Sequence, residues 1–173
     1  MIIIETNRLF LREMTIDDFN NLYKVLNDSD IMKHYPYTFD DKRVQGWINK
    51  NIERYKTLGF GLWAVCLKEN GEMIGDCGLT LQNINHNILP EIGYHIRKDY
   101  QRHGYAKEAA IAVRDWAFKN TTFNYIFSYM NAENIPSIKT AISYGCKEVS
   151  EYLDENNTLI KVFAIARCDW KNK

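Results

Sequence analysis

Apolar residues recur along this chain at two spacings, every second residue in some segments and every third or fourth in others. The first spacing is typical of strands with one buried face, and the second is typical of amphipathic helices. Strands are predicted over residues 8–14, 62–67, 73–79, 90–98, 124–130, 147–153 and 158–168. Helices are predicted over residues 15–27, 40–56, 104–117 and 134–144.

Local signals mark several ends of these elements. Asn134 is a suitable N-cap for the last helix, and Gly145 suits the position just after it. The dipeptide Asn70-Gly71 predicts a two-residue hairpin turn. Pro90 is expected to begin the fourth strand as an edge or entry residue.

The element order β-α-α-β-β-β-α-β-α-β-β predicts an α/β (α+β) domain. Its central run of hairpins distinguishes it from a doubly wound fold. The length of 173 residues suits one domain with its own core. We expect a single domain over residues 1–173, in which seven strands form a central sheet flanked by about four helices.

Composition narrows the class of protein. Hydrophobic residues make up 46%, and 22 basic residues balance 22 acidic ones, so nucleic acid and membranes are not expected partners. The start of the chain lacks a signal sequence, and no apolar run approaches the roughly 18–20 residues of a membrane-spanning helix. The four cysteines are scattered without metal-ligand spacing. We therefore expect a cytoplasmic protein without a structural metal.

The segment Gln101–Ala106 joins the fourth predicted strand to a helix and contains Gly104. Backbone N–H groups at such a helix start point towards an anion. Arg102, His103 and Lys107 sit at or before the first helical turn, where the helix dipole disfavours cations. These residues are equally consistent with a bound phosphate group and with an ordinary turn whose basic side chains are solvated.

Two common nucleotide-binding motifs do not match this chain. The G-x-x-x-x-G-K-[ST] loop is absent, and the G-x-G-x-x-G fingerprint has no counterpart after the first predicted strand. The remaining candidate for a phosphate-binding motif is Gln101-x-x-Gly104-x-Ala106. It is followed about thirty residues later by an asparagine-rich junction of strand and helix.

With these motifs the chain resembles the GNAT N-acetyltransferases, whose acetyl-coenzyme A signature is Q/R-x-x-G-x-G/A after the fourth strand. It is similar in particular to the branch that acetylates the N-termini of ribosomal proteins. The resemblance runs nearly end to end through Thr6–Arg12, His34–Tyr37, Trp47-Ile48, Glu91–Ile96 and Asn131-x-x-Asn134-x-x-Ser137 with Gly145. It implies a GNAT fold, with a mixed and mostly antiparallel sheet that splays apart between the fourth and fifth strands.

The resemblance also implies that acetyl-coenzyme A is the acetyl-donating cosubstrate. Backbone N–H groups of the turn would hold its pyrophosphate, and its pantetheine arm would lie along the end of the fourth strand, with an asparagine on the other side. The expected cofactor-binding residues are Ile96, Arg97, Lys98, Gln101, Arg102, His103, Gly104, Tyr105, Ala106, Asn131 and Asn134.

Acetyl transfer to an amine requires that the ammonium group lose a proton and that the departing thiolate receive one. Glu91 is the candidate base, because a half-buried carboxylate in a cleft has a raised pKa; the alternative is an ordinary ion pair with a neighbouring cation. Ser137 is the candidate donor to the thiolate, or else stabilises the first turn of its own helix. His95 alternates onto the strand face of Glu91 and could assist proton removal, or could simply be packed there.

Two tyrosines are possible acids in other branches of this family. Tyr144 directly precedes Gly145, whereas the usual catalytic tyrosine falls about a turn earlier, where this chain has Ala141. That placement speaks against Tyr144. Tyr129 is the other candidate acid. The chain also differs from the family at Cys146, which directly follows Gly145 and stands where the family commonly has an aromatic residue.

Acceptor specificity is expected in the segment 30–37 and in the turn 154–157. Tyr35, Tyr37 and His95 are the candidate acceptor-binding residues, although the tyrosines could equally pack under the helices. The leading hypothesis is an acetyl-coenzyme A-dependent N-acetyltransferase acting on a primary amine, either a protein N-terminus, which the resemblance favours, or a small molecule. The alternatives are an enzyme for polyamines or aminoglycoside-like amines, and an acyl-coenzyme A-binding module without catalysis. The chain would act as a monomer or a homodimer.

Overall fold

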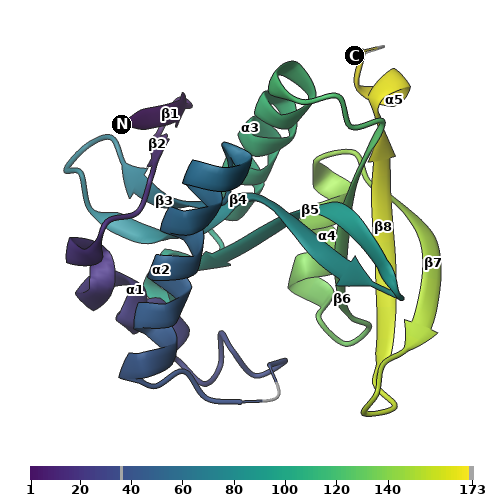
Figure 1. Cartoon of the computed structure of the whole chain (residues 1–173), viewed down its shortest axis with the longest axis horizontal. Helices are drawn as coiled ribbons and strands as arrows, with labels where there is room; N and C mark the ends of the chain where they lie inside the picture. Colours follow the sequence, from purple (N-terminus) through teal and green to yellow (C-terminus); the bar gives the residue numbers. More distant parts are fainter. Residues whose placement is uncertain (36, 172–173) are drawn as a thin grey trace.

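The computed structural model describes residues 1–35 and 37–171, and Pro36, within the segment expected to determine acceptor specificity, lies outside the described residues (Figure 1). Within this part of the chain, one mixed sheet of eight strands has the order β1-β2-β3-β4-β5-β6-β8-β7. The strands are β1 (Ile2–Glu5), β2 (Leu9–Arg12), β3 (Leu62–Leu67), β4 (Met73–Ile84), β5 (Asn87–Ile96), β6 (Tyr125–Asn131), β7 (Lys147–Leu153) and β8 (Leu159–Ala166). Neighbouring strands are antiparallel except β5 and β6, which are parallel.

The helices connect these strands and cover the sheet. They are α1 (Phe19–Leu26), α2 (Asp41–Leu58), α3 (Tyr105–Asn120), α4 (Ile135–Ser143) and α5 (Arg167–Lys171), with short 3-10 turns η1 (Ile16–Asp18) and η2 (Lys98–Tyr100). None of the described helices is both long and apolar enough to cross a bilayer.

The core lies on both faces of the sheet, and β3 shows how. Trp63, Val65 and Leu67 pack into a cluster with α3 and α4, while the alternate residues Leu62 and Ala64 pack into a second cluster with α1 and α2. Successive side chains of a strand point to opposite faces. A strand covered on both faces is apolar throughout, which explains the continuous run seen in the sequence.

Several predicted element ends are confirmed. Asn134 caps α4 by accepting a hydrogen bond from the Ser137 N–H, and Gly145 has a φ of 103° just beyond the helix. Gly71 has a φ of 75° in the turn between β3 and β4, which suits a residue without a side chain. The predicted two-residue hairpin was wrong, because residues 68–72 connect the strands and the Leu67 N–H donates to the Glu72 carbonyl.

The sheet has one strand more than the seven expected. Residues Ile2–Glu5 form an additional strand, β1, because they pair with β2. That short segment does not alternate between apolar and polar residues, so its sequence pattern did not predict a strand. At the other end of the chain, the last strand stops at Ala166 rather than Cys168. Arg167 turns the chain there by donating hydrogen bonds to the carbonyls of Thr121 and Phe123, just beyond the end of α3.

The prediction that Pro90 begins a strand was wrong. β5 begins at Asn87, directly after a turn in which Asn85 and His86 have positive φ. Pro90 lies inside β5, opposite Leu81. The Arg97 N–H donates to the Ile74 carbonyl, so by alternation Pro90 directs its missing N–H away from β4, and no bond of that ladder is lost.

β5 and β6 diverge at the centre of the sheet, as the resemblance implied. Their register contains a single pair, Glu91 with Phe127. The Ser128 hydroxyl donates to the Ile92 carbonyl over 2.8 Å, and the Tyr94 hydroxyl donates to the Ser137 carbonyl over 3.1 Å. Side-chain bonds therefore link β5 to β6 and α4 beyond the point where backbone pairing stops. Figure 1 shows β6, β7, β8 and α5 grouped on one side of the molecule, with α1 and α2 on the other.

Candidate active site

The turn between β5 and α3 has the geometry of an anion site. Gly104, the N-cap of α3, has a φ of 83° and offers no side-chain cap to the helix. Arg102 also has a left-handed conformation, with a φ of 64°, which is uncommon for a residue with a side chain. The first N–H groups of α3 are therefore left for another acceptor. Basic side chains beside them suit a phosphate group.

Predicted residues fix this turn by side-chain hydrogen bonds. Gln101 donates through Nε2 to the Ile96 carbonyl over 2.9 Å. His103 contacts the Gln101 carbonyl through Nδ1 at 2.8 Å, and its ring stacks on Tyr105. The shape of the turn is thus set locally by its own polar side chains.

A second group of residues, which the sequence reasoning missed, holds the turn from outside. Arg8 donates from Nη1 to the His103 carbonyl over 3.0 Å, and its guanidinium lies 4.5 Å from the centre of the Tyr105 ring. Glu108, in the first turn of α3, accepts hydrogen bonds from Arg8 Nε and the Thr6 hydroxyl, each over 2.7 Å. We call Thr6, Arg8 and Glu108 the turn clamp. The motif Thr6–Arg12 was part of the resemblance, but only the fold brings it to α3.

Several polar groups at the end of β5 already form ion pairs or hydrogen bonds within the protein. Arg97 forms ion pairs with Glu72 and Asp99, at 2.8 and 2.7 Å, and Lys98 forms one with Asp30. These two predicted cofactor residues thus direct their charges at neighbouring carboxylates. The Arg97 N–H belongs to the β4–β5 ladder, and the Ile96 carbonyl accepts from Gln101. By alternation, the Ile96 N–H points away from β4, towards the diverging side of β5.

Glu91 is buried, with 8% of the residue exposed. It lies on β5 directly opposite Thr80 of β4, whose hydroxyl donates to Oε2 over 2.9 Å. A side chain on Gly93 would come within 3.3 Å of both carboxylate oxygens, so the glycine leaves room for the carboxylate. Burial raises the pKa of Glu91 to about 7, and the Thr80 hydroxyl, His95 and Arg54 partly oppose that rise.

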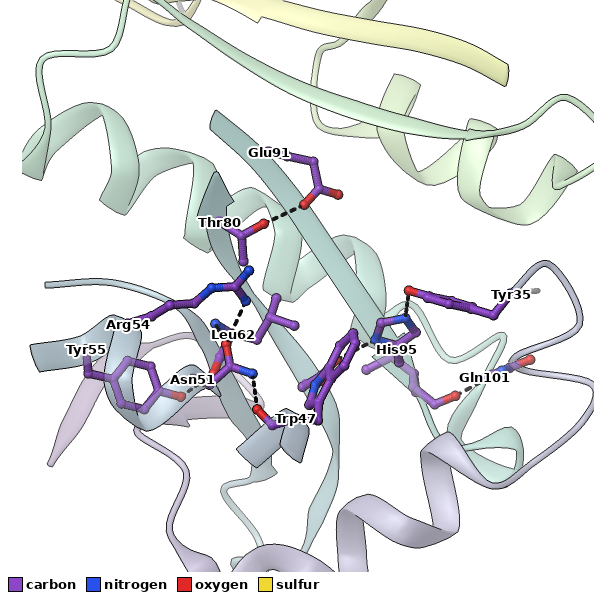
Figure 2. Close-up of polar contacts among 12 residues, drawn as sticks. Tyr35, Trp47, Asn51, Arg54, Tyr55, Leu62, Thr80, Glu91, His95 and Gln101 are labelled. Carbon is purple, nitrogen blue, oxygen red and sulfur yellow. Dashed lines mark hydrogen bonds and ion pairs between the residues drawn. The ribbon is translucent and has the colours of Figure 1, made fainter. Parts of the chain in front are cut away.

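Arg54 approaches Glu91 from α2 and was not predicted from the sequence. Its Nη1 donates to Asn51 Oδ1 over 3.3 Å, and Asn51 itself is fully buried between α2 and β3. Figure 2 shows Arg54 beside Thr80 and Glu91. No ion pair joins Arg54 to Glu91 among the described residues, so the carboxylate is not neutralised by a direct salt bridge.

His95 lies on the same face of β5, as predicted, and both of its ring nitrogens are hydrogen-bonded. Nδ1 is 2.8 Å from Asp76 Oδ1, and Nε2 is 2.9 Å from the Tyr35 hydroxyl. Trp47 of α2 donates to the other Asp76 oxygen over 2.9 Å. Figure 2 shows His95 facing Tyr35, with Trp47 beside it. The structure thus joins two predicted acceptor-binding residues, His95 and Tyr35, in one polar network.

The residues just before and at the start of α4 lie opposite β5, on the side where β5 and β6 diverge. The Asn131 side chain accepts from the Glu133 N–H, and the Asn134 side chain caps α4. Because Asn134 performs the capping, the Ser137 hydroxyl is not needed for it. Tyr94 of β5 reaches this helix by donating to the Ser137 carbonyl. Ser137 therefore lies near the open side of β5.

The tyrosines differ in their surroundings. Tyr37 is exposed and stacks against Arg43, whose guanidinium is 4.3 Å from the ring centre. Tyr129 is half-buried, and burial together with Glu91 raises its pKa to about 12. Tyr144 is completely buried, and its hydroxyl bonds to Ser128 inside the core. That burial agrees with the sequence argument against Tyr144 as an acid.

Residues 8–147 match the model of the acetyltransferase (GNAT) domain. The chain is 34% identical to the uncharacterised Bacillus subtilis protein YkkB over 81% of this chain and 82% of that one. It is 30% identical to the uncharacterised N-acetyltransferase YnaD of the same organism, over 83% and 82% of the two chains.

Solved structures share the fold. A GNAT-family acetyltransferase from Bacillus anthracis superposes with a TM-score of 0.83 at 24% identity, covering 96% of this chain and 99% of that one. RimL, a ribosomal L7/L12 α-N-protein acetyltransferase solved with coenzyme A, has a TM-score of 0.78 at 17% identity, covering 96% and 98%. A spermidine N-acetyltransferase from Vibrio cholerae, solved with coenzyme A and spermine, has the same TM-score at 19% identity, covering 96% and 100%. The chain therefore belongs to the GNAT acetyltransferase family.

Proposed function

We propose that this protein transfers the acetyl group of acetyl-coenzyme A to a primary amine, with Glu91 as the base. The observation that carries the proposal is the position of Glu91. It is a buried carboxylate on the face of β5 that holds the other polar groups of the site, and its pKa of about 7 leaves a large fraction ionised at neutral pH. A group with a pKa near the working pH is an effective proton acceptor.

The turn at the start of α3 would hold the coenzyme A pyrophosphate through the N–H groups of Arg102 to Ala106. The uncapped helix end, the left-handed Gly104 and the basic side chains fit that group. When bound there, acetyl-coenzyme A supplies the thioester. The Ile96 N–H on the open side of β5 is a suitable donor to the acetyl carbonyl, and Asn131 at the end of β6 and Asn134 at the start of α4 would border the arm from the other side.

Ser137 would provide the hydrogen bond to the departing thiolate. Its helix start lies across from the open edge of β5, and the capping role already belongs to Asn134. A hydroxyl near the sulfur assists the reaction only while the thiolate forms. Replacing Ser137 by alanine should therefore lower kcat more than it changes the KM for acetyl-coenzyme A.

The acceptor would enter from the side of Tyr35 and Tyr37. We propose the amine of a peptide N-terminus as the acceptor, and a small amine such as a polyamine as the second candidate. The fold likeness to RimL favours the first, and the equal likeness to a spermidine N-acetyltransferase favours the second. Fold alone does not decide between substrates.

The experiment is thiol release from acetyl-coenzyme A with a panel of N-terminal peptides, polyamines and aminoglycosides. Glu91→Gln should lower kcat by about 100-fold with the best acceptor, since general-base catalysis contributes about that much or more. Binding of coenzyme A should be unchanged in this variant. Tight binding of acetyl-coenzyme A without thiol release from any amine would instead identify a non-catalytic binding module.

We further propose a cytoplasmic location and a monomeric or dimeric state. The described cysteines, Cys66, Cys77, Cys146 and Cys168, form no disulfide, which is usual for cytoplasmic proteins. Light scattering of the purified protein, with and without coenzyme A, would measure its oligomeric state.

A further inference from the structure

Four residues from three separate elements and one loop meet on the face of β5 that also holds Glu91, four residues along the strand from it. Asp76 of β4 and His95 of β5 face each other across the antiparallel ladder, Trp47 comes from α2, and Tyr35 comes from the segment before α2. The Asp76 side chain is fully buried, that of His95 is 12% exposed, and Tyr35 is partly exposed. The chain of hydrogen bonds thus runs from the buried Asp76 carboxylate through His95 to the Tyr35 hydroxyl.

Hydrogen-bond chemistry assigns the direction of this chain. An ionised carboxylate can only accept, so Nδ1 of His95 carries the hydrogen that points to Asp76. In the neutral ring, Nε2 is then an acceptor, and the Tyr35 hydroxyl donates to it. This leaves the lone pairs of the Tyr35 oxygen available to a further donor. The arrangement can therefore accept a proton at Tyr35 while Tyr35 passes its own proton to Nε2.

Acetylation of an ammonium group removes two protons from its nitrogen. One is balanced by the proton that the thiolate gains, and the other leaves the site. Glu91 accepts one proton at a time, so a second acceptor on the same face of β5 would serve the second deprotonation.

Resting on the function proposed above, we propose that Asp76, His95 and Tyr35 form a second proton acceptor for the acetyl-transfer reaction. In this step an N–H bond of the acceptor nitrogen breaks and an O–H bond to Tyr35 forms. At the same time the original Tyr35 O–H bond breaks and an N–H bond forms at His95 Nε2. The resulting imidazolium is balanced by the Asp76 carboxylate, and the proton returns to water by the same route after turnover.

The charges around His95 support this assignment. Burial by itself lowers the pKa of His95, but the charge and hydrogen bond of Asp76, together with the charge of Glu91, raise it above its ordinary value. Trp47, from α2, stabilises Asp76 as the carboxylate by donating to it. Arg54 is the cation on α2 that lies towards Glu91 rather than His95. His95 therefore holds an accepted proton more readily than an ordinary imidazole does.

The test uses Tyr35→Phe and His95→Gln in the full-length protein, with acetyl-coenzyme A and the best acceptor of the panel. Tyr35→Phe keeps the ring that packs edge-on against Phe39 and removes only the hydroxyl. Tyr23→Phe is the matched control, because Tyr23 packs in the same apolar cluster and its hydroxyl makes no hydrogen bond among the described residues. We expect kcat to fall at least tenfold in both relay variants and to stay within twofold in the control.

The pH dependence of kcat separates a relay from mere packing. Two groups must be deprotonated in the wild type, so log kcat should fall on the acid side with a slope of about two, and with a slope of about one in either relay variant. NMR titration of the His95 ring should show a lower pKa in Asp76→Asn than in the wild type. An active wild type whose kcat and acid slope are unchanged by Tyr35→Phe and His95→Gln would overturn the relay. A wild type that releases no thiol with any amine would overturn the proposed function instead.

Discussion

The carboxylate of Asp76 and the imidazole of His95 lie directly opposite each other on β4 and β5, with 2.8 Å between Oδ1 and Nδ1. The same two strands place Thr80 opposite Glu91 four residues away. Cross-strand neighbours in an antiparallel pair are close enough to bond directly. The β4–β5 ladder therefore aligns the Asp76–His95 pair and Glu91 on one face of the sheet.

The buried state of Glu91 should make stability depend on pH. Its pKa is about 7 in the folded protein, compared with 4.5 as an ordinary value, so the native state binds the proton more tightly than the unfolded state does. The free energy of unfolding should therefore decrease as pH rises from about 4.5 to 7, by roughly 3 kcal/mol. Urea denaturation at pH 5 and pH 8 measures this change. Glu91→Gln should lack it, and an equal change in that variant would assign the effect to other groups.

The turn clamp should control coenzyme A binding without joining the chemistry. Arg8→Ala removes the guanidinium that holds the His103 carbonyl and lies over Tyr105. We expect about tenfold weaker binding of coenzyme A, equivalent to about 1.4 kcal/mol, with little change in kcat. Titration calorimetry measures the affinity.

Lys68→Ala is the matched control for Arg8→Ala, because Lys68 forms an exposed ion pair with Glu5 at the same end of the sheet. Exposed pairs contribute little, so coenzyme A affinity should not change in the control. A fall in kcat with unchanged affinity in Arg8→Ala would contradict the positioning role.

The ion pair of Arg12 and Asp18 should be a main contributor to the stability of the N-terminal region. Two guanidinium nitrogens donate to the two oxygens of Asp18, at 2.8 and 2.7 Å, and Asp18 is only 4% exposed. Asp18→Ala leaves the Arg12 charge without its partner and should cost roughly 3 kcal/mol. Asp17→Ala, at an exposed neighbouring position, should change stability by less than about 0.5 kcal/mol.

The pH response of this ion pair has a definite sign. Burial raises the pKa of Asp18, but hydrogen bonds from Arg12 and Thr15 outweigh it and lower the pKa below 3.8. The stabilisation is therefore present above the ordinary pKa and is lost as pH falls through the folded value. Acid unfolding, monitored by circular dichroism, should begin at a higher pH in Asp18→Ala than in the wild type. The whole of this shift should come from the lower stability that the variant already has at neutral pH.

The Ser128 hydroxyl should be important for the divergence of β5 and β6. It donates to the Ile92 carbonyl and bonds to the Tyr144 hydroxyl, and both side chains are fully buried. Ser128→Ala removes the donor to the buried Ile92 carbonyl and one of the two hydrogen-bond partners of the Tyr144 hydroxyl, the other being Cys146, and should cost about 2 kcal/mol. In a double-mutant cycle, adding Tyr144→Phe should cost less in the Ser128→Ala background than alone. Strict additivity in urea denaturation would show that the two hydroxyls act independently.

Periodicity in the sequence was enough to predict most of the fold. The helices around Val44 and Val113 and the strand 62–67 follow from local spacing, because each buries one face or both against the sheet. β1 and the true start of β5 were missed, since a short strand is stabilised by its partner and Pro90 is tolerated only because of its register. Such features depend on pairing between segments that local pattern does not describe.

For the site, three features were predictable from the amino-acid sequence: the turn Gln101–Ala106, the helix start at Asn134 and the placement of Glu91 and His95 on one strand face. These follow from residue type and alternation within one element. The fold, in contrast, was needed to show that Asp76, Tyr35 and Trp47 surround His95, and that Arg8 reaches the turn before α3. The reason is physical: hydrogen bonds and burial between distant segments set the charge state and position of these side chains, and neither is expressed in local sequence.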